Sequence, residues 1–276
     1  MAESELTNIK SPRVKAVRRL TKRAFRDRDR SFIAEGPQAV REALALDGVV
    51  TQLFATAEAE VRHADLVAAA AAAGVPAQRA SGEVMAELAQ TVTPQGLLAV
   101  CRFVHVPLDD AVTADARLVA VLAHVRDPGN AGTVLRTADA AGADAVVFTD
   151  ASVDPYNGKC VRASAGSLFH LPVVTGTPVA RAVGRLKEQG LRVLAADGAG
   201  ERTLDDVDLS GPVAWVFGNE AWGLPEEILK LADEVVRVPI YGGAESLNLA
   251  TAAAVCLYAS ARSQRAGSPG SAARLP

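Results

Sequence analysis

Residues 212–225 read PVAWVFGNEAWGLP and place a glycine-rich polar loop directly after an apolar run. We expect a strand over 212–217 with this loop at its carboxyl end. Ligands of open α/β sheets bind at the loops that follow the strands. Because two glycines let the backbone approach a ligand closely while Asn219 and Glu220 offer fixed polar groups, the stretch indicates a binding site.

A second loop of this kind lies upstream. Residues 124–136, HVRDPGNAGTVLR, follow the apolar run 117–123 and contain a Pro-Gly turn. We expect a helix from about Asn130, which puts Arg136 about one and a half turns into it. The alternative is that Asn130 only caps the helix and that Arg136 is solvated.

The third loop lies downstream and leads into an apolar helix. Residues 238–248, VPIYGGAESLN, contain a Gly-Gly pair that can turn sharply. Ser246 and Asn248 are placed either to contact a ligand or simply to cap the helix. The helix, at about 247–262, is apolar over more of its surface than one buried stripe needs, so a partner is expected to cover the surplus.

The strand pattern of the second half predicts a parallel sheet. Apolar runs recur with helical patterns between most of them, at 117–123, 144–148, 171–174, 191–196, 212–217 and 234–238. Strands that alternate with helices form largely parallel sheets covered on both faces. We therefore expect an α/β domain over 117–262.

The first 104 residues predict a smaller α/β unit. A strand is expected at 49–55, helices at about 62–73 and 82–90, and a second strand at 97–104. The chain of 276 residues is long enough for two domains, here 1–104 and 117–262. The polar segment 105–116 is the expected linker, and residues 263–276, rich in Gly, Ser, Ala and Pro, are the expected disordered tail.

Positive charge is concentrated near the N-terminal end. Residues 1–30 carry ten Lys and Arg against four acids, a balance of +6, which leaves −9 for the remainder of a chain with net charge −3. Apolar residues fall at helical spacing among these charges, so 10–30 is expected to be a basic amphipathic helix. We interpret it as a surface for the phosphates of a polyanion, with a solvated basic tail as the alternative. The residues expected to contact phosphates are Arg13, Lys15, Arg18, Arg19, Lys22, Arg23 and Arg26.

Composition argues against several classes of site. No run of about 18 apolar residues lacks a charge or a breaker, so we expect no membrane span. The first residues show no secretory pattern, which favours a cytoplasmic location. Cys101, Cys160 and Cys256 lie far apart and form no CxxC pair, so neither a metal site nor a disulfide is expected.

Together and in this order, the three loops resemble the signature motifs of the SpoU/TrmH family of RNA 2′-O-ribose methyltransferases, in the SPOUT superfamily. Residues 10–20 (KSPRVKAVRRL), 32–36 (FIAEG) and 93–96 (TPQG) look like the family's N-terminal substrate-binding domain of the L30e type. The resemblance implies S-adenosyl-L-methionine as cofactor, a homodimer, and a C-terminal SPOUT domain with a deep trefoil knot around the second and third motifs.

The same resemblance gives roles to individual residues, and it makes the basic residues of 10–30 RNA-binding. The catalytic set that it implies is Arg136, Asn130, Glu220, Ser246 and Asn248. The cofactor-binding set that it implies is Phe217, Gly218, Asn219, Gly223, Val238, Ile240, Ser246 and Leu247.

Arg136 admits two chemical roles. The resemblance makes it the group that accepts the proton when a methyl group is transferred to a ribose hydroxyl. A guanidinium stays protonated in proteins, however. Arg136 is therefore also placed to grip an RNA phosphate in a bidentate manner, while a phosphate oxygen or a water takes the proton.

Other classes of protein agree less well with the sequence. A Rossmann-type cofactor site requires a GxGxxG pattern, which the loop at 124–136 lacks. A serine hydrolase is disfavoured because Ser164 lacks the first glycine of a nucleophile elbow. An RNA-binding protein that keeps the fold without activity is an alternative, against which the intact motifs argue. The L30e-like domain favours structured ribosomal RNA, 23S rRNA above all, with transfer RNA as the alternative substrate.

Overall fold

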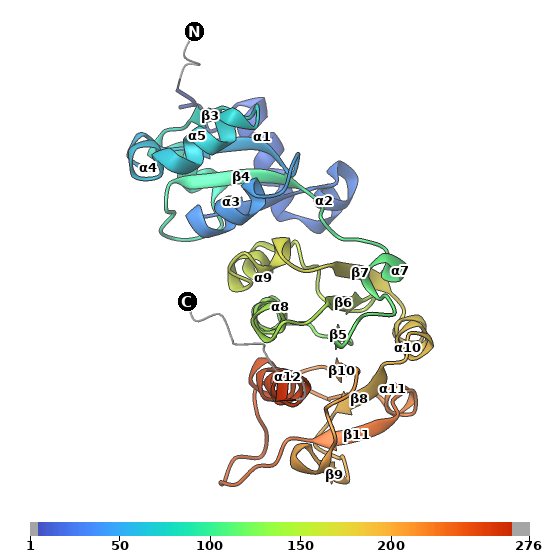
Figure 1. The fold of residues 1–276 in the computed structure, drawn as a ribbon. Helices are drawn as coiled ribbons and strands as arrows, with labels where there is room; N and C mark the ends of the chain where they lie inside the picture. The colour runs from blue at the N-terminus through green and yellow to red at the C-terminus, as the bar shows by residue number, and fades with distance from the viewer. Residues whose placement is uncertain (1–4, 267–276) are drawn as a thin grey trace. The chain divides into compact units, whose positions relative to one another are not determined.

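The computed structural model describes residues 5–266, which form two compact units. Unit 1 consists of residues 5–104 together with 154–170, and unit 2 of residues 105–153 together with 171–266. Each unit is built on one β-sheet (Figure 1).

Unit 1 has a four-stranded sheet in the order β1-β4-β2-β3. β1 and β2 both pair antiparallel with β4, and β3 joins β2 in parallel. The strands are β1 Ser31–Glu35, β2 Val50–Ala55, β3 Ala77–Arg79 and β4 Leu97–Arg102. The α and 3-10 helices are α1 Pro12–Arg18, η1 Arg19–Thr21, α2 Arg23–Asp29, α3 Pro37–Leu44, α4 Ala57–Arg62, α5 Ala64–Ala72, α6 Gly82–Leu88, α9 Gly158–Ala163 and η2 Ser167–Phe169.

The basic N-terminal segment is not the single helix predicted over 10–30. Ser11 caps α1 through its hydroxyl oxygen. The 3-10 helix η1 follows α1 directly, and α2 begins after one further residue. α2 ends where Arg30 adopts a left-handed conformation with φ 50°. The apolar side of the segment is as predicted, because Val14, Val17 and Leu20 are buried against the sheet of unit 1.

Residues 154–170 belong to unit 1, although the predicted boundary placed them in the second domain. Asp154 accepts hydrogen bonds from the Arg26 guanidinium at 2.9 and 2.6 Å, and both side chains are buried. The Tyr156 ring stacks on Phe103 at 4.0 Å and lies 4.6 Å from Phe32. A buried ion pair and an aromatic cluster therefore hold this segment in unit 1.

Unit 2 has a seven-stranded sheet in the order β7-β6-β5-β10-β8-β11-β9, in which every neighbouring pair is parallel. The strands are β5 Leu118–Leu122, β6 Ala145–Thr149, β7 Val173–Thr177, β8 Arg192–Ala196, β9 Arg202–Thr203, β10 Val213–Phe217 and β11 Glu234–Arg237. The helices are α7 Leu108–Ala111, α8 Pro128–Ala141, α10 Val179–Glu188, η3 Leu204–Asp206, α11 Glu226–Leu229 and α12 Leu249–Ala266. The predicted parallel α/β sheet is confirmed.

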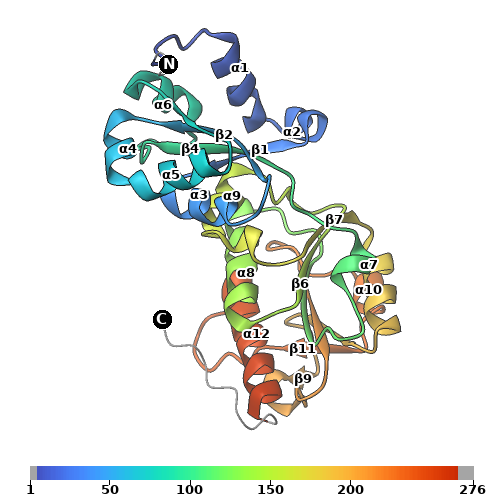
Figure 2. The ribbon, with the colours of Figure 1, turned by 45° about the horizontal axis from the view of Figure 1, so that its top comes forward.

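Helices cover both faces of this sheet (Figures 1 and 2). α8 and α12 pack together on one face, and α7, α10 and α11 lie on the other. In β10, Ala214 and Val216 face the α10 layer, whereas the Trp215 indole N–H donates to Ser260 Oγ of α12 at 2.9 Å. β5, β6 and β10 are buried along their whole length, which is why their sequences are unbroken apolar runs.

Three further boundaries differ from the prediction. The expected linker 105–116 contains α7 and contributes Leu108 and Val112 to the core of unit 2. α12 continues to Ala266, so residues 263–266 of the expected tail are helical, and 267–276 lie outside the described residues. The helix expected at about 62–73 is α5, and the separate helix α4 directly before it was not predicted.

Candidate active site

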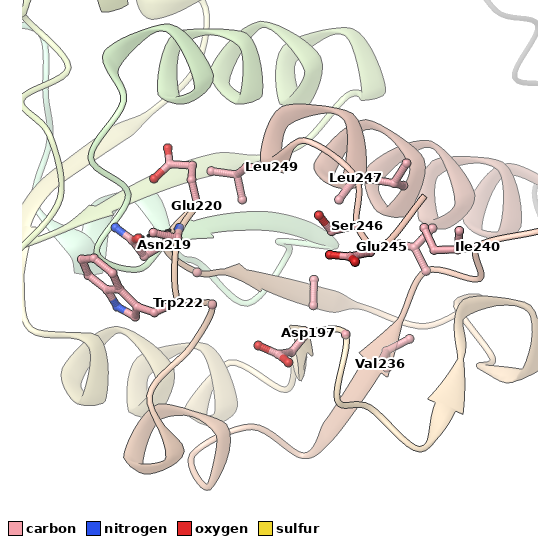
Figure 3. A pocket seen from close by; sticks show the side chains of 17 residues that line it. Asp197, Asn219, Glu220, Trp222, Val236, Ile240, Glu245, Ser246, Leu247 and Leu249 are labelled. Atoms are coloured by element: carbon pink, nitrogen blue, oxygen red, sulfur yellow. Dashed lines mark hydrogen bonds between the residues drawn. The ribbon is translucent and has the colours of Figure 1, made fainter. Parts of the chain in front are cut away.

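A cavity lies at the carboxyl edge of the unit 2 sheet, between the loops that follow β8, β10 and β11 (Figure 3). These strands are parallel, so their loops leave from the same edge. The cavity measures about 410 Å³, within the range of about 300–1,000 Å³ typical of small-ligand sites. Two of the three predicted loops, 218–223 and 238–248, therefore contribute to one site.

The loop after β10 is a tight, rigid turn. Asn219 and Gly223 exchange both backbone hydrogen bonds at 2.9 Å, and Gly223 has a φ of 67° that favours glycine. A Cβ on Gly218 would lie 2.6 Å from the Gly223 backbone. The Asn219 side chain donates to the His124 carbonyl at 2.9 Å and accepts from the Ala221 amide at 2.8 Å. Asn219 therefore fixes this turn to the loop after β5.

One side chain from each predicted loop joins a chain of hydrogen bonds. The Asn130 side-chain amide donates to Glu220 Oε1 at 3.1 Å, and the Asn248 amide donates to Asn130 Oδ1, also at 3.1 Å. Glu220 also accepts from the backbone amides of Arg126 and Asp127, at 3.3 and 3.2 Å. These pairs are 90 and 118 residues apart in sequence, so only the fold brings them together.

The two candidate caps behave differently. α8 begins at Pro128, and its cap is Asp127, whose side chain accepts from the Asn130 amide at 2.8 Å. The capping alternative for Asn130 is therefore wrong, and its side chain is free to bond Glu220. Asn248 does cap α12, since its Oδ1 accepts from the Ala250 amide at 2.9 Å, while its Nδ2 faces Asn130.

Arg136 stands apart from the cavity lining. It lies eight residues after Pro128, about two helical turns into α8 rather than the predicted one and a half. Its side chain is exposed and makes no hydrogen bond or ion pair with any residue in 5–266. Its guanidinium is therefore available to a ligand from outside the chain.

Most residues of the predicted cofactor set line the cavity. Those that do are Gly218, Asn219, Gly223, Val238, Ile240, Ser246 and Leu247. Phe217 does not, because its side chain is buried in β10 and stacks on Trp215, with ring centroids 6.3 Å apart. At this position only the backbone is left to meet a ligand.

Several further residues line the cavity that the sequence motifs did not indicate, among them Asp197, Trp222 and Glu245. Asp197 accepts from the Leu224 amide at 3.3 Å and directly follows β8. The rule that ligands bind at the loops after strands is the signal that would have found it. With Glu220, the lining has three carboxylates, and none of the described lining residues is Lys or Arg. The cavity therefore favours a ligand that carries positive charge.

The loop from β11 to α12 is anchored outside the cavity. Tyr241 donates its phenol hydrogen to Asp205 Oδ2 at 2.9 Å. This hydrogen bond raises the pKa of Tyr241, because the neighbouring carboxylate disfavours the phenolate. Tyr241 thus holds the loop to η3 and leaves the side chains of Glu245 and Ser246 at the cavity (Figure 3).

The basic residues of the N-terminal segment divide into two groups. Arg26 is 3% exposed and bound by Asp154, so its side chain does not reach solvent, and its predicted RNA contact is wrong. The other predicted contacts, Arg13, Lys15, Arg18, Arg19, Lys22 and Arg23, are exposed. Several are paired at the surface, for example Arg18 with Glu87 at 2.5 Å and Arg23 with Asp27 at 3.6 Å. Such exposed pairs are weak and exchange readily for phosphate.

Thiol and metal chemistry have little support in residues 5–266. Cys101, Cys160 and Cys256 are buried, and none of them is in a disulfide within these residues. Burial raises the pKa of the Cys256 thiol to about 12, so it carries almost no thiolate at neutral pH. Within the same residues, no three or more His, Cys, Asp or Glu side chains gather as a metal site would require. In this part of the chain, no helix is both long and apolar enough to cross a membrane.

A parallel α/β domain with an acidic, loop-lined cavity at its carboxyl edge is a small-ligand domain, here joined to a second domain with a basic surface. The SpoU rRNA Methylase family model matches residues 117–258, and the MRM3-like substrate binding domain model matches residues 11–99. The chain belongs to the SpoU rRNA methylase family, and the predicted family is confirmed.

Relatives and solved structures agree with this assignment. The chain is 35% identical over 254 residues to the Bacillus subtilis 23S rRNA (guanosine(2553)-2′-O)-methyltransferase RlmP, covering 92% of this chain and 98% of that protein. An AdoMet-bound rRNA methyltransferase from Sinorhizobium meliloti is 33% identical, with a TM-score of 0.84 over 94% of this chain and 97% of that one. The Streptomyces viridochromogenes SpoU methyltransferase AviRb, in complex with AdoMet, is 27% identical, with a TM-score of 0.82 over 93% and 100%.

Proposed function

We propose that this chain transfers a methyl group from S-adenosyl-L-methionine to the 2′-hydroxyl of a ribose in 23S ribosomal RNA. The observation that carries the proposal is the hydrogen-bonded chain Glu220–Asn130–Asn248 beside an acidic cavity. Membership of the SpoU family supports it, as does the 23S rRNA 2′-O-methyltransferase among the relatives.

The cavity residues are compatible with this cofactor. S-adenosyl-L-methionine carries a sulfonium and an ammonium group, which the carboxylates of Asp197, Glu220 and Glu245 complement. Val238, Ile240 and Leu247 offer apolar contacts to the adenosine, and Gly218 and Gly223 let the backbone come close. When bound, the cofactor supplies an electrophilic methyl group on the sulfonium.

The residues beside the cavity would hold the ribose in position. Methyl transfer needs the 2′-hydroxyl oxygen close to the methyl carbon and in line with the bond that breaks. Asn130 bonds both Glu220 and Asn248, which fixes the orientation of the two asparagine side chains. Their remaining donors and acceptors therefore point in fixed directions. Ser246 lines the cavity beside them and offers a hydroxyl to the ribose.

Arg136 would act on the RNA rather than on the cofactor. It does not line the cavity, it is exposed, and it has no partner among residues 5–266. Because a guanidinium stays protonated, we assign to it the bidentate grip on an RNA phosphate. A phosphate oxygen or a water would then take the proton of the ribose hydroxyl.

Unit 1 would hold structured RNA through phosphates, as an L30e-type substrate-binding domain. The match of residues 11–99 to a substrate-binding domain supports this role, and so does the exposure of Lys15, Lys22 and the neighbouring arginines. Binding through phosphates weakens steeply with salt. The cytoplasm, where ribosomal RNA is found in bacteria, is the expected location.

We also propose that the chain is a homodimer and that a trefoil knot forms around 218–223 and 238–248. On α12, Val255 and Tyr258 are 39% and 47% exposed, as the predicted surplus of apolar surface requires. α8 packs beside α12 and carries Arg136, which does not reach the cavity of its own chain. In the dimer we propose, the interface lies over this helix pair and Arg136 of one chain serves the cavity of the other.

The substrate is tested by offering two RNAs in parallel. Purified protein with tritiated S-adenosyl-L-methionine should label unmodified 23S rRNA and leave unmodified transfer RNA unlabelled. Labelling of transfer RNA alone would replace the proposed substrate by the alternative. Labelling of neither RNA, with cofactor bound normally, would favour a catalytically silent RNA-binding protein.

A further inference from the structure

Trp222 is an exposed aromatic side chain at the edge of the cofactor cavity. Its side chain is 60% exposed, whereas Trp215 seven residues earlier is fully buried. Its indole makes no hydrogen bond or ring contact with any residue in 5–266. Burial of a large apolar side chain stabilises a fold, and here that gain is largely not realised within the chain. The fold therefore does not explain why a tryptophan stands at this position.

The turn that presents Trp222 is rigid without any help from it. The two backbone hydrogen bonds between Asn219 and Gly223 close the turn, and the Asn219 side chain ties it to the His124 carbonyl. The tight packing of Gly218 against the Gly223 backbone leaves little freedom. The indole is thus held at a fixed place, as a stacking surface must be to gain affinity.

The position of Trp222 is that of a substrate contact. Figure 3 shows it at the end of the cavity where Asn219 and Glu220 lie, away from Ile240 and Leu247 at the other end. Glu220 accepts a hydrogen bond from Asn130, which in turn accepts one from Asn248. These two asparagines would hold the ribose. The base is attached to the carbon next to the one that bears the 2′-hydroxyl, so a ribose held there brings its base to the mouth of the cavity.

We propose that Trp222 stacks on the base of the nucleotide whose ribose is methylated, an inference that rests on the proposed function. Proteins recognise unpaired RNA bases by stacking them on aromatic side chains. Stacking is worth about 1–3 kcal/mol per base and tolerates every base, because each has a π face. Trp222 is therefore a positioning residue that captures the target nucleotide after it leaves its helix or loop.

Kinetics of Trp222→Ala and Trp222→Phe test this role. Trp222→Ala should raise the KM for 23S rRNA by about 5- to 150-fold, the factor that corresponds to the loss of one stacked base, and should change kcat less. Trp222→Phe keeps a smaller ring and should recover most of the loss. The Kd for S-adenosyl-L-methionine, measured by isothermal titration, should stay within about twofold of wild type in both variants.

Fluorescence gives a second readout that a structural role would not move. The chain has two tryptophans, and Trp215 is buried. Addition of 23S rRNA should quench wild-type emission, and the same addition to Trp222→Phe, which keeps only Trp215, should leave emission nearly unchanged.

Three results would overturn the inference while leaving the proposed function intact. They are an unchanged KM in an active Trp222→Ala enzyme, a loss of cofactor affinity as large as the rise in KM, and a change of oligomeric state on light scattering. The second would make Trp222 a lid on the cofactor, and the third an interface residue. A wild-type enzyme that methylates no RNA would instead remove the proposed function.

Discussion

Arg136 projects from α8 without a partner among residues 5–266, so its loss should affect the reaction and not the fold. Arg136→Ala should lower methyl transfer to 23S rRNA by ~10²-fold or more while the Kd for S-adenosyl-L-methionine stays the same. Arg136→Lys keeps the charge but loses the planar fork, so a bidentate phosphate grip predicts that it stays badly impaired. Tritium transfer and isothermal titration measure the two effects separately. Wild-type activity in Arg136→Ala, or an equal loss of cofactor binding, would refute this role.

Arg26 is the opposite case, an arginine whose role is in the fold. Its guanidinium is bound by Asp154 and by the carbonyls of Leu20 and Thr21, at 2.9 and 2.8 Å. Removing one partner of a buried ion pair leaves the other charge uncompensated, so Arg26→Ala should lower the free energy of unfolding by about 3–5 kcal/mol. Urea denaturation measures this.

Arg23→Ala is the matched control for Arg26→Ala. Arg23 lies in the same helix, and among the described residues it forms an exposed ion pair with Asp27. Its removal should change stability by less than about 0.5 kcal/mol. Equal stability of the two variants would show that Arg26 is not the anchor described here.

These two arginines show how far sequence reasoning reaches at the scale of residues. The resemblance to the family's motifs implied roles for Asn130, Glu220 and Asn248, and the structure joins all three by hydrogen bonds. Nothing local separates Arg26 from Arg23, because the burial of Arg26 depends on Asp154, 128 residues away. Trp222 was missed because the binding role of its loop was given to the glycines, Asn219 and Glu220, and residue type alone does not show that the tight turn leaves the indole exposed.

At the scale of elements, α12 must stay docked for the site to form, since Asn248 caps it. The Trp215 indole of β10 donates to Ser260 Oγ, and both residues are buried. Ser260→Ala leaves the indole N–H without a partner and should cost about 1–3 kcal/mol in the free energy of unfolding. Ser263→Ala, at a partly buried position of the same helix, should change it by less than about 0.5 kcal/mol. Denaturant midpoints that do not separate the two variants would argue against this contact.

The long elements were predictable because their burial is periodic or continuous. The apolar runs at 117–123 and 212–217 became β5 and β10, and strands of two or three residues such as β9 and β3 have too few positions to show a pattern. The N-terminal segment kept its predicted apolar side but is divided into α1, η1 and α2. The division depends on backbone turns, among them the left-handed Arg30, that side-chain spacing does not record.

At the scale of the whole molecule, the proposed dimer predicts that two inactive variants complement each other. Arg136→Ala and Glu220→Ala chains, co-expressed with different tags and purified as a mixed dimer, should contain one site with both residues intact. If Arg136 serves the cavity of the partner, this mixed dimer should recover about half the wild-type rate. A mixed dimer as inactive as either parent would place Arg136 and Glu220 in the same chain's site.

Domain boundaries were the least predictable feature at this scale. Residues 154–170 continue the sequence of the family's catalytic domain, yet they pack in unit 1 through Asp154 and Tyr156. Long-range pairs of this kind leave no mark in composition or periodicity. They also make truncation at residue 104 a poor test of unit 1, because it would uncover buried groups, so single substitutions such as Lys15→Ala and Lys22→Ala are preferable.

The most direct test of the central claim is to map the methyl group on the RNA. Unmodified 23S rRNA is incubated with the protein and S-adenosyl-L-methionine, and 2′-O-methylated positions are located by their resistance to alkaline cleavage. We predict one new protected position, absent without cofactor and strongly reduced with Arg136→Ala. A methyl group found on a base, or no protected position while the RNA is labelled, would contradict ribose methylation.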